Sequence, residues 1–489
     1  MCITLINTII SRIMKVGPIQ RQSIISLASI VGVTVVSYLA TIYFAHFLGP
    51  AILGAFYLIT AYYAIFDLIA SGGFGTAATK RISEGREQNE FYTASVIVRL
   101  ILLGLSILVF VLVSSYLVGI ASADLFYLFI FLLIAGSINA ICSVDVSGTA
   151  RIGIFQTSNF INTIVKLLIQ VFAVFIGWGL GGLIVGFIAG LLAAALVNYK
   201  FIHLTLTRCN LSHFKDLSSF AFWTFLSSSG NFVFSNVDTI LISLFLSIDE
   251  VGIYRIAFQL ATVSAIAVTA LNSVLFPRIS RWHTEQNFPM ISLVISKAIT
   301  YSLVLAVPIT VGGTLLADRL MYFLYGASFE SGSLCLIILL FAEIANIFMY
   351  LFTMCLNSVN KPRESFVVMG ITAVINIVFN LLLIPVFGIN GAAVAMLGTM
   401  LVNAFLAYIF LRPVVAISIE VKSIGYMLLS ALIMAGVLLV YVHFVKIETF
   451  VSLLISILLG ALIYFVILLK LDGAIQADLK KIIKEVSVS

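Results

Sequence analysis

Seven ionisable side chains fall inside long apolar runs of the sequence, where an uncompensated charge is costly. Four are cations and three are carboxylates: Arg99, Lys166, Arg255 and Lys297, and Asp67, Asp238 and Glu343. A cation in such a setting binds an anionic group or neutralises a carboxylate, and a carboxylate there pairs with a cation or takes up a proton. These residues are therefore the first candidates for function.

Arg99 and Lys297 lie 198 residues apart, each about six residues into an apolar run that follows a basic loop. Six residues of helix rise about 9 Å, so the two cations would lie at a similar depth. This placement favours joint binding of an anionic group. The alternative is that both side chains snorkel back to the membrane surface.

Lys166 and Glu343 lie near the middle of two other apolar runs, too deep for easy snorkelling. We predict that Lys166 contacts a phosphate or a partner carboxylate. Glu343 could pair with Lys166 or titrate as a coupling group for protons. A satisfied structural pair within one half of the protein is the alternative for both residues.

The remaining three candidates also have two interpretations. Arg255 could receive an anionic head group, while an ion pair between Asp238 and Arg255 is the structural alternative. Asp67 is expected to be structural, either bonding the backbone near the Gly72–Gly73 break or pairing with Arg99. No HExxH or CxxC pattern occurs in the chain, so we expect neither a catalytic residue nor a metal site.

The elements that must position these residues are membrane-spanning helices. Of the 489 residues, 62% are hydrophobic and only 9% are charged. A helix needs about 20 mostly apolar residues to cross a bilayer, and the chain offers about fourteen such runs. The predicted spans are approximately 24–46, 52–71, 93–118, 124–144, 155–176, 181–200, 218–246, 251–275, 291–316, 332–356, 365–385, 390–411, 423–444 and 449–469.

The positive charges are distributed unequally between the two sides of these spans. Twenty of the 26 Lys and Arg residues fall on the side that holds both termini, two (Arg319 and Lys446) fall on the other, and four lie within spans. Positive residues accumulate on the cytoplasmic side of membrane proteins, so both termini are predicted to be cytoplasmic. The net charge of +6 then reflects topology, and no nucleic-acid partner is expected.

The chain also resembles itself at offsets of 198 and 209 residues. Phe47-Leu48 matches Phe245-Leu246, and Gly179-Leu180-Gly181-Gly182 matches Gly388-Ile389-Asn390-Gly391. We therefore predict two six-helix lobes in parallel orientation, residues 1–215 and 216–412, with two further helices and a cytoplasmic tail in residues 413–489. In transporters with such repeats, the substrate binds between the halves, which rock to give alternating access.

A series of short local sequences is spread over most of residues 20–412, and none of them is a catalytic signature. They are Phe47-Leu48-Gly49-Pro50 with Gly54, Asp67 and Gly72-Gly73-Phe74-Gly75, then Asp238, Val251-Gly252-Ile253-Tyr254, Phe276-Pro277-Arg278-Ile279-Ser280, Tyr325-Gly326 and the stretch from Asn376 through Asn380 and Ile384-Pro385 to Ala393. In this order they resemble the sequences of polysaccharide and O-antigen flippases, the polysaccharide-transporter branch of the multidrug/oligosaccharidyl-lipid/polysaccharide exporter superfamily.

The resemblance implies a protein without enzymatic activity that flips polyprenyl-diphosphate-linked oligosaccharide from the cytoplasmic to the outer leaflet of the cell membrane. In that function, Arg99, Lys166, Arg255 and Lys297 would bind the diphosphate, and Glu343, Asp238 and Asp67 would serve coupling or gating. No cofactor is implied, while coupling to H⁺ or Na⁺ is left open. The candidate partners are the lipid-linked oligosaccharide, the bilayer, and a glycan polymerase or glycosyltransferases of the same pathway.

Two other functions are alternatives to the flippase function. An ion-coupled multidrug antiporter of the same fold usually has twelve spans, fewer than the fourteen predicted for this chain. An integral-membrane glycan polymerase or ligase generally needs a sizeable outer loop with catalytic side chains, whereas the longest predicted outer loop covers only residues 317–331. The chain also lacks a Walker A motif for ATP hydrolysis.

Overall fold

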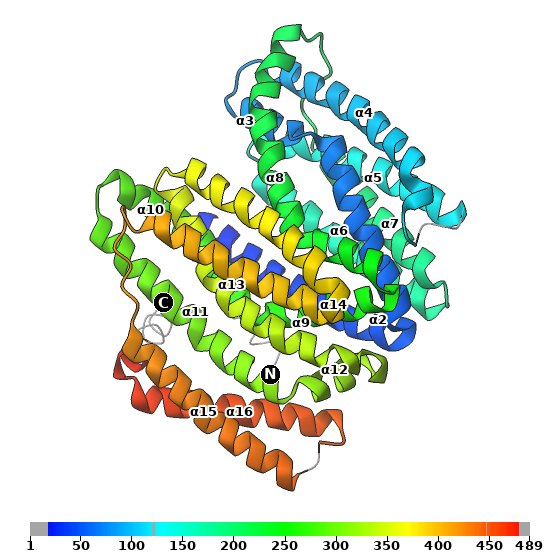
Figure 1. Cartoon of the computed structure of the whole chain (residues 1–489). Helices are drawn as coiled ribbons and strands as arrows, with labels where there is room; N and C mark the ends of the chain where they lie inside the picture. Colours follow the sequence, from blue (N-terminus) through cyan, green and yellow to red (C-terminus); the bar gives the residue numbers. More distant parts are fainter. Residues whose placement is uncertain (1–17, 120–122, 446, 479–489) are drawn as a thin grey trace. The chain divides into compact units, whose positions relative to one another are not determined.

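The computed structural model describes residues 18–119, 123–445 and 447–478. Throughout these ranges the chain is built from helices and contains no β-strand (Figure 1). Lipid offers no hydrogen-bonding partner to the backbone, so an apolar segment that enters it must satisfy its own N–H and C=O groups, as a helix does. The predicted all-α class is confirmed.

The chain forms two compact units that meet in sequence between Phe232 and Val233. Unit 1 contains α2 (Pro18–Ser71), α3 (Phe74–Ser83), α4 (Gln88–Val113), η1 (Ser114–Tyr116), α5 (Ala123–Gly148), α6 (Ile152–Phe175), α7 (Gly179–Tyr199) and the first part of α8 (Leu211–Phe245). Unit 2 contains the rest of α8 and α9 (Ile248–Ala261), η2 (Thr262–Ala265), α10 (Ile266–Thr284), α11 (Phe288–Leu315), α12 (Ala317–Tyr325), η3 (Ala327–Gly332), α13 (Ser333–Ser358), α14 (Pro362–Leu411), α15 (Val421–Phe444) and α16 (Phe450–Leu471).

Within the described residues, eleven helical segments are long and apolar enough to cross a membrane. Two of them, α2 and α14, are each interrupted by one non-helical residue, Gly49 and Gly388 respectively. Both interruptions fall in gaps that the sequence predicts between consecutive spans. The structure thus has a polytopic membrane fold and is consistent with fourteen spans, a number that stays a prediction.

The internal repeat is visible in the backbone at Gly179 and Gly388, which the sequence aligns at an offset of 209. Gly179 has φ +56° and Gly388 has φ +61°. Both angles lie in the left-handed region, which glycine adopts without the steric penalty of a Cβ atom. Gly179 is the first residue of α7 and Gly388 is the non-helical residue within α14, so both lie at the start of the last predicted span of their repeat.

Within unit 1, α6 and α7 pack unusually closely. A Cβ atom added to Gly186 would lie 2.4 Å from the Gln170 side chain, and one added to Gly190 would lie 2.6 Å from the Asn162 carbonyl oxygen. Small residues at four-residue spacing let two membrane helices approach in this way. Lys166 lies at this contact, because a Cβ atom added to Gly190 would lie 2.9 Å from the Lys166 Cβ atom.

Within unit 2, α15 and α16 pack against each other and against α11 (Figure 1). Buried residues of α11, α13 and the α15–α16 pair belong to one apolar core. The helices predicted as an appended pair are therefore part of the same compact unit as the second lobe. The compact units are defined by contacts, whereas the predicted lobes are defined by the sequence repeat. The predicted lobe boundaries at residues 215 and 412 therefore stay predictions.

Candidate functional site: charged residues within the apolar helices

Arg99 is held in unit 1 by contacts with two neighbouring helices. Its guanidinium forms an ion pair with Asp67 of α2, and Arg99 Nε donates to Ser137 Oγ of α5 at 3.2 Å. Arg99 lies eleven residues beyond Gln88, the first residue of α4, which corresponds to about 16 Å of helix. The structure thus places Arg99 deeper along its helix than the sequence suggests and brings together Arg99 and Asp67.

Lys166 lies on α6 at the face that packs on α7. Its ammonium nitrogen is 5.7 Å from the ring centroid of Phe187, a distance at which the ring face attracts a cation. One turn further along, Gln170 Nε2 donates to the Leu183 carbonyl oxygen at 2.7 Å. Among the described residues, no carboxylate lies within ion-pair distance of Lys166.

Asp238 lies in unit 2, within a buried cluster formed by α8, α9 and α14. Its carboxylate accepts hydrogen bonds from the Tyr254 hydroxyl and from Asn380 Nδ2, both at 2.7 Å. Asn380 Nδ2 also lies 3.3 Å from Asn376 Oδ1, while Asn380 Oδ1 is buried without a hydrogen-bond partner. The cluster therefore gathers several side-chain oxygens around one carboxylate.

Arg255 lies close to this cluster, one residue after Tyr254. Arg255 Nη1 donates to the Ser235 carbonyl oxygen at 3.0 Å, and the guanidinium carbon lies 5.6 Å from the ring centroid of Phe258. Arg255 thus lies beside the buried cluster, with a hydrogen bond to the backbone of α8.

Lys297 has a different environment from its predicted counterpart Arg99. Its ammonium nitrogen lies 2.8 Å from Asp478, beyond α16, and the Tyr301 hydroxyl donates to the same carboxylate. The Lys297 side chain is 39% exposed, whereas Arg99 is 8% exposed. The two cations that the repeat aligns thus pair with carboxylates from unrelated parts of the chain.

Glu343 is buried in α13, where it retains 2% of its exposed area. Asn346 Nδ2, on the following turn, donates to Glu343 Oε2 at 2.8 Å. A hydrogen bond from a neutral amide stabilises a buried carboxylate less than a hydrogen bond from a cation. Among the described residues, the hydrogen-bond partner of the buried Glu343 carboxylate is thus a neutral amide.

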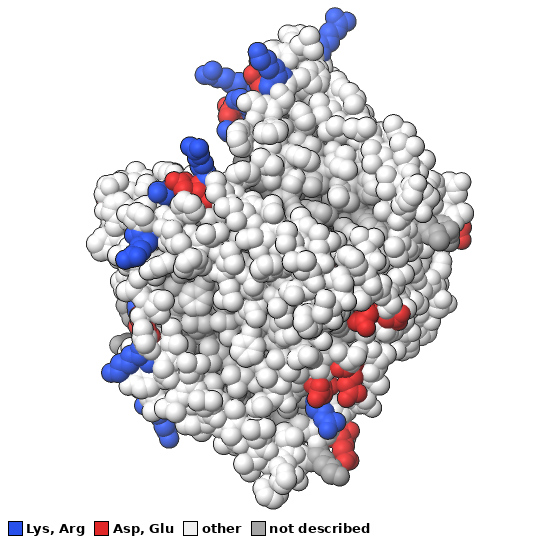
Figure 2. Space-filling view, in the orientation of Figure 1, with Lys and Arg blue, Asp and Glu red and all other residues white. Residues whose placement is uncertain are grey.

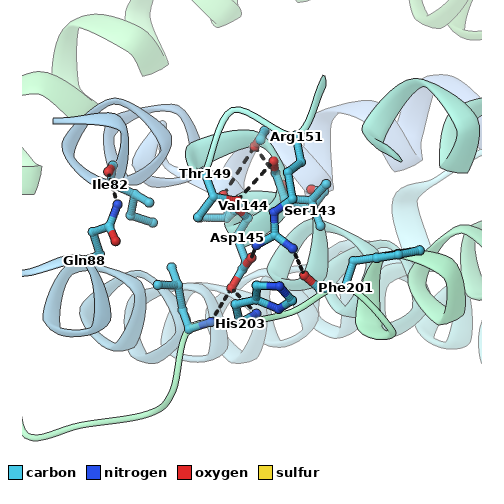
Figure 3. Close-up of polar contacts among 12 residues, drawn as sticks. Ile82, Gln88, Ser143, Val144, Asp145, Thr149, Arg151, Phe201 and His203 are labelled. Atoms are coloured by element: carbon cyan, nitrogen blue, oxygen red, sulfur yellow. Dashed lines mark hydrogen bonds and ion pairs between the residues drawn. The ribbon is translucent and has the colours of Figure 1, made fainter. Parts of the chain in front are cut away.

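Sequence reasoning missed a further buried carboxylate, Asp145, at the end of α5. Figure 3 shows it beside Arg151 and the backbone near His203. Asp145 is fully buried, lies 3.1 Å from the Arg151 guanidinium, and accepts the backbone N–H groups of His203 and Leu204 at 3.1 and 2.7 Å. The prediction ended the span at residue 144, so Asp145 was not counted among the intramembrane charges.

An apolar pocket of about 380 Å³ lies within unit 2. It is lined by aliphatic residues, glycines and one phenylalanine from η2 and helices α9, α11, α12, α13, α15 and α16, including Leu305, Pro308, Leu340, Met434 and Phe465. No polar side chain lines it, so it suits hydrocarbon. The described residues contain no cluster of three His, Cys, Asp or Glu side chains that could hold a metal ion.

The distribution of charge on the surface agrees with membrane embedding. Figure 2 shows broad uncharged areas on the visible face of both units, with Lys, Arg, Asp and Glu confined to limited patches. Exposed leucines, valines and phenylalanines are frequent along α4, α14, α15 and α16. The cations Arg12, Lys15, Lys446, Lys480, Lys481 and Lys484, which enter the predicted charge asymmetry, lie outside the described residues.

The chain is similar in sequence to two known proteins. The chain is 29% identical to the probable low-salt glycan biosynthesis flippase Agl15 of Haloferax volcanii, over 92% of this chain and 96% of that protein. It is 26% identical to the probable flippase AglR of the same organism, over 66% of this chain and 68% of that protein.

Solved structures share the fold at low sequence identity. The lipid II flippase MurJ in an inward closed conformation matches with a TM-score of 0.76 at 17% identity, over 91% of this chain and 98% of that chain. An inward-facing multidrug resistance MATE family transporter matches with a TM-score of 0.64 at 14% identity, over 78% and 94% of the two chains.

The helical fold together with the family and relative matches defines a polytopic membrane transporter of the multidrug/oligosaccharidyl-lipid/polysaccharide exporter superfamily. Within this superfamily, the chain belongs to the polysaccharide biosynthesis protein family, whose model matches residues 20–283, more than half of the chain. The MatE family model matches residues 224–382. The predicted membership is confirmed.

Proposed function

We propose that this protein flips polyprenyl-diphosphate-linked oligosaccharide from the cytoplasmic to the outer leaflet of the cell membrane by alternating access. The transport would serve the biosynthesis of surface polysaccharide or glycoconjugates, with both termini cytoplasmic and no covalent chemistry. The observation that carries the proposal is the similarity, over 92% of the chain, to a probable glycan biosynthesis flippase. A glycan polymerase or glycosyltransferases would act before and after it.

Moving the substrate through the membrane requires polar and cationic partners for its head group. Its diphosphate is charged and its sugars carry many hydroxyls, each of which costs several kcal/mol when unpaired in lipid. Arg99, Lys166, Arg255 and Lys297 are the proposed diphosphate ligands. Arg99 and Lys297 already pair with Asp67 and Asp478, so phosphate would replace a carboxylate there.

Lys166 differs from these two, because the described residues offer it an aromatic ring and no carboxylate within ion-pair distance. An ammonium in apolar surroundings gains most from an arriving anion, since no existing ion pair has to be broken. We therefore assign Lys166 the first contact with the diphosphate. The diphosphate would then displace Asp67 from Arg99 and Asp478 from Lys297. The return of these carboxylates to the two cations would later assist release of the diphosphate.

Asp238 and Glu343 are the proposed coupling groups in unit 2, and Asp67 the gating group in unit 1. Asp238 lies among the Asn376 and Asn380 amides, and Asn380 Oδ1 is buried without a hydrogen-bond donor. Carboxylate and amide oxygens suit a hard cation such as Na⁺, and a carboxylate can also carry H⁺. Binding of either ion would neutralise Asp238 and change its contact with Tyr254.

The apolar pocket in unit 2 suits part of the polyprenyl tail. Its apolar lining offers hydrocarbon an environment similar to that of the lipid tails, so the polyprenyl tail would contact no polar side chain there. The tail would thus stay among apolar residues while the head group contacts the cations.

The test is a reconstituted flipping assay with purified protein in liposomes. A fluorescent polyprenyl-diphosphate oligosaccharide is supplied, and an impermeant enzyme cleaves the sugar only in the outer leaflet. Protein-dependent gain of cleavage supports the proposal, and imposed pH or sodium gradients then identify the coupling ion. No gain of cleavage together with gradient-driven efflux of cationic dyes would instead support a multidrug-type antiporter, the alternative favoured by the MatE match over residues 224–382.

A further inference from the structure

The segment that joins α7 to α8, residues 201–210, is the α7–α8 linker. Two of its backbone N–H groups, those of His203 and Leu204, donate to the buried carboxylate of Asp145 (Figure 3). Arg151 pairs with the same carboxylate and also donates to the Phe201 carbonyl oxygen. One carboxylate on α5 therefore ties the first half of the linker to unit 1.

The second half of the linker is held by α4. The Thr205 N–H donates to Asn89 Oδ1 and the Thr207 N–H donates to Thr93 Oγ1, each at 2.9 Å. Asn89 and Thr93 are one helical turn apart on α4, and Thr205 and Thr207 are two residues apart, as on one edge of an extended strand. The linker thus crosses the first turns of α4 in register.

The start of α8 is fixed to the same place. His213, which is 6% exposed, lies 3.3 Å from Glu87 through its Nε2 atom, and its ring packs edge-on against Phe91 of α4. The second half of the linker and the first turn of α8 are therefore attached to the start of α4, while the first half is attached to α5. Any displacement of α4 must carry them with it unless these bonds break.

Unit 2 has a similar arrangement at the equivalent place in its own repeat. The segment after α14 is held along α11, where Ser292 and Ser296 donate to the Ala416 and Ser418 carbonyl oxygens. In both repeats the linker that follows the sixth predicted span is bonded, at one-turn spacing, to the helix of the third predicted span. The recurrence indicates that this attachment is a property of the repeat.

We propose that Asp145 is a positioning residue for transport: by clamping the first half of the α7–α8 linker to α5, it keeps Thr205 and Thr207 bonded to α4, so that movement of α4 is passed through the linker to α8. This inference rests on the proposed function, because Arg99 lies on α4 only six residues after Thr93. A substrate that displaces Asp67 from Arg99 would shift α4, and the clamp would pass that shift to the helix that leads into unit 2. Asp145 itself does not contact the substrate, since its carboxylate is fully buried by these partners.

The test replaces Asp145 by asparagine, which keeps the shape but removes the charge that holds Arg151. We expect Asp145→Asn to reduce the initial flipping rate at least tenfold while binding of the lipid-linked oligosaccharide changes less than twofold. Hydrogen exchange of the amides of residues 203–207 should accelerate at least tenfold. Asp124→Asn, at the exposed opposite end of α5, is the matched control and should leave all three quantities unchanged.

A chemical cross-link between the linker and α4 tests whether Asp145→Asn slows flipping by releasing the linker or by some other effect. In Asp145→Asn protein that lacks the five native cysteines, Asn89→Cys and Thr205→Cys are joined by a short bismaleimide. Restored flipping on cross-linking supports the proposal, and unrestored flipping overturns it. Two further outcomes overturn it: a flipping rate within twofold of wild type despite faster exchange in the linker, and a loss of binding as large as the loss of rate.

The proposed function and the clamp can fail separately. A wild-type protein that moves no lipid-linked oligosaccharide overturns the proposed function. Unchanged exchange of residues 203–207 in Asp145→Asn overturns the clamp, whatever the substrate.

Discussion

At the scale of single residues, the intramembrane charges differ in how they are compensated. Arg99 and Lys297 each have a carboxylate partner, whereas Lys166 faces the ring of Phe187. Glu343 has an amide, and Asp238 has a hydroxyl and an amide. A paired charge is stabilised in the resting protein, while an incompletely compensated one gains more from a ligand. Lys166 therefore offers the clearest test of substrate binding.

Replacing Lys166 by methionine keeps the length of the side chain and removes its charge. We expect the flipping rate to fall at least tenfold while the melting temperature stays the same or rises, because an uncompensated charge leaves an apolar site. Lys166→Arg should retain an intermediate rate. Wild-type flipping by Lys166→Met would remove Lys166 from the substrate site; Lys215→Met, at an exposed position, is the control.

For variants of the Arg99–Asp67 ion pair, we expect the loss of stability and the loss of flipping to be separable. Asp67→Asn alone leaves the buried Arg99 guanidinium without its carboxylate and should destabilise the protein by about 1–3 kcal/mol. The double variant Arg99→Met/Asp67→Asn should regain most of that stability but not the flipping rate. Denaturation in detergent and the flipping assay give the two readouts, and additive losses of stability would contradict coupling between the two residues.

At the scale of the elements, the contact between α6 and α7 decides where Lys166 points. Gly186 and Gly190 bring the α7 backbone against Gln170 and Asn162 of α6. The separation of two membrane helices depends on the smallest residues at their contact. A larger residue there would push α6 away and move Lys166 with it.

Gly186→Ala tests this contact. The added methyl group meets Gln170 at 2.4 Å, so overpacking should destabilise the protein by about 1–3 kcal/mol and lower the flipping rate. Gly104→Ala on α4 is the matched control, because nothing lies within 4 Å of its added Cβ. Equal melting temperatures for the two variants would show that α6 and α7 tolerate a wider separation.

At the scale of the whole molecule, the prediction that carries most weight is the orientation in the membrane. It rests on the unequal distribution of Lys and Arg between the two sides of the predicted spans. The alternation of fourteen spans makes every loop a test of it. A missing or additional span would reverse the assignment of all later loops.

Single cysteines introduced into protein without its native cysteines test this orientation in intact cells. Arg86→Cys and Arg363→Cys should be shielded from an impermeant maleimide until the membrane is opened. Asp124→Cys and Glu330→Cys should react at once. All four positions are exposed in the structure, so burial would not explain a lack of labelling. Reaction of the first pair in intact cells would contradict cytoplasmic termini.

The sequence by itself determined the class of the protein and the approximate limits of its helices. Apolar runs of about 20 residues permit only one backbone structure in lipid, and the breaks at Gly49 and Gly388 fall where glycine interrupts such runs. The repeat was also readable, because the residues from Gly179 match those from Gly388 at a fixed offset. These properties depend on local composition and chain geometry, which the sequence contains directly.

The tertiary structure alone decided which charges meet. Asp67 and Arg99 are 32 residues apart and Lys297 and Asp478 are 181 apart. The sequence suggested Arg99 as one of two partners for Asp67 and indicated no carboxylate for Lys297. Asp145 looked like a loop residue, yet the folded linker buries it completely. Ion pairs depend on how helices rotate and pack against one another, and packing is set by the combined shape of many side chains. Periodicity along one helix does not carry that information.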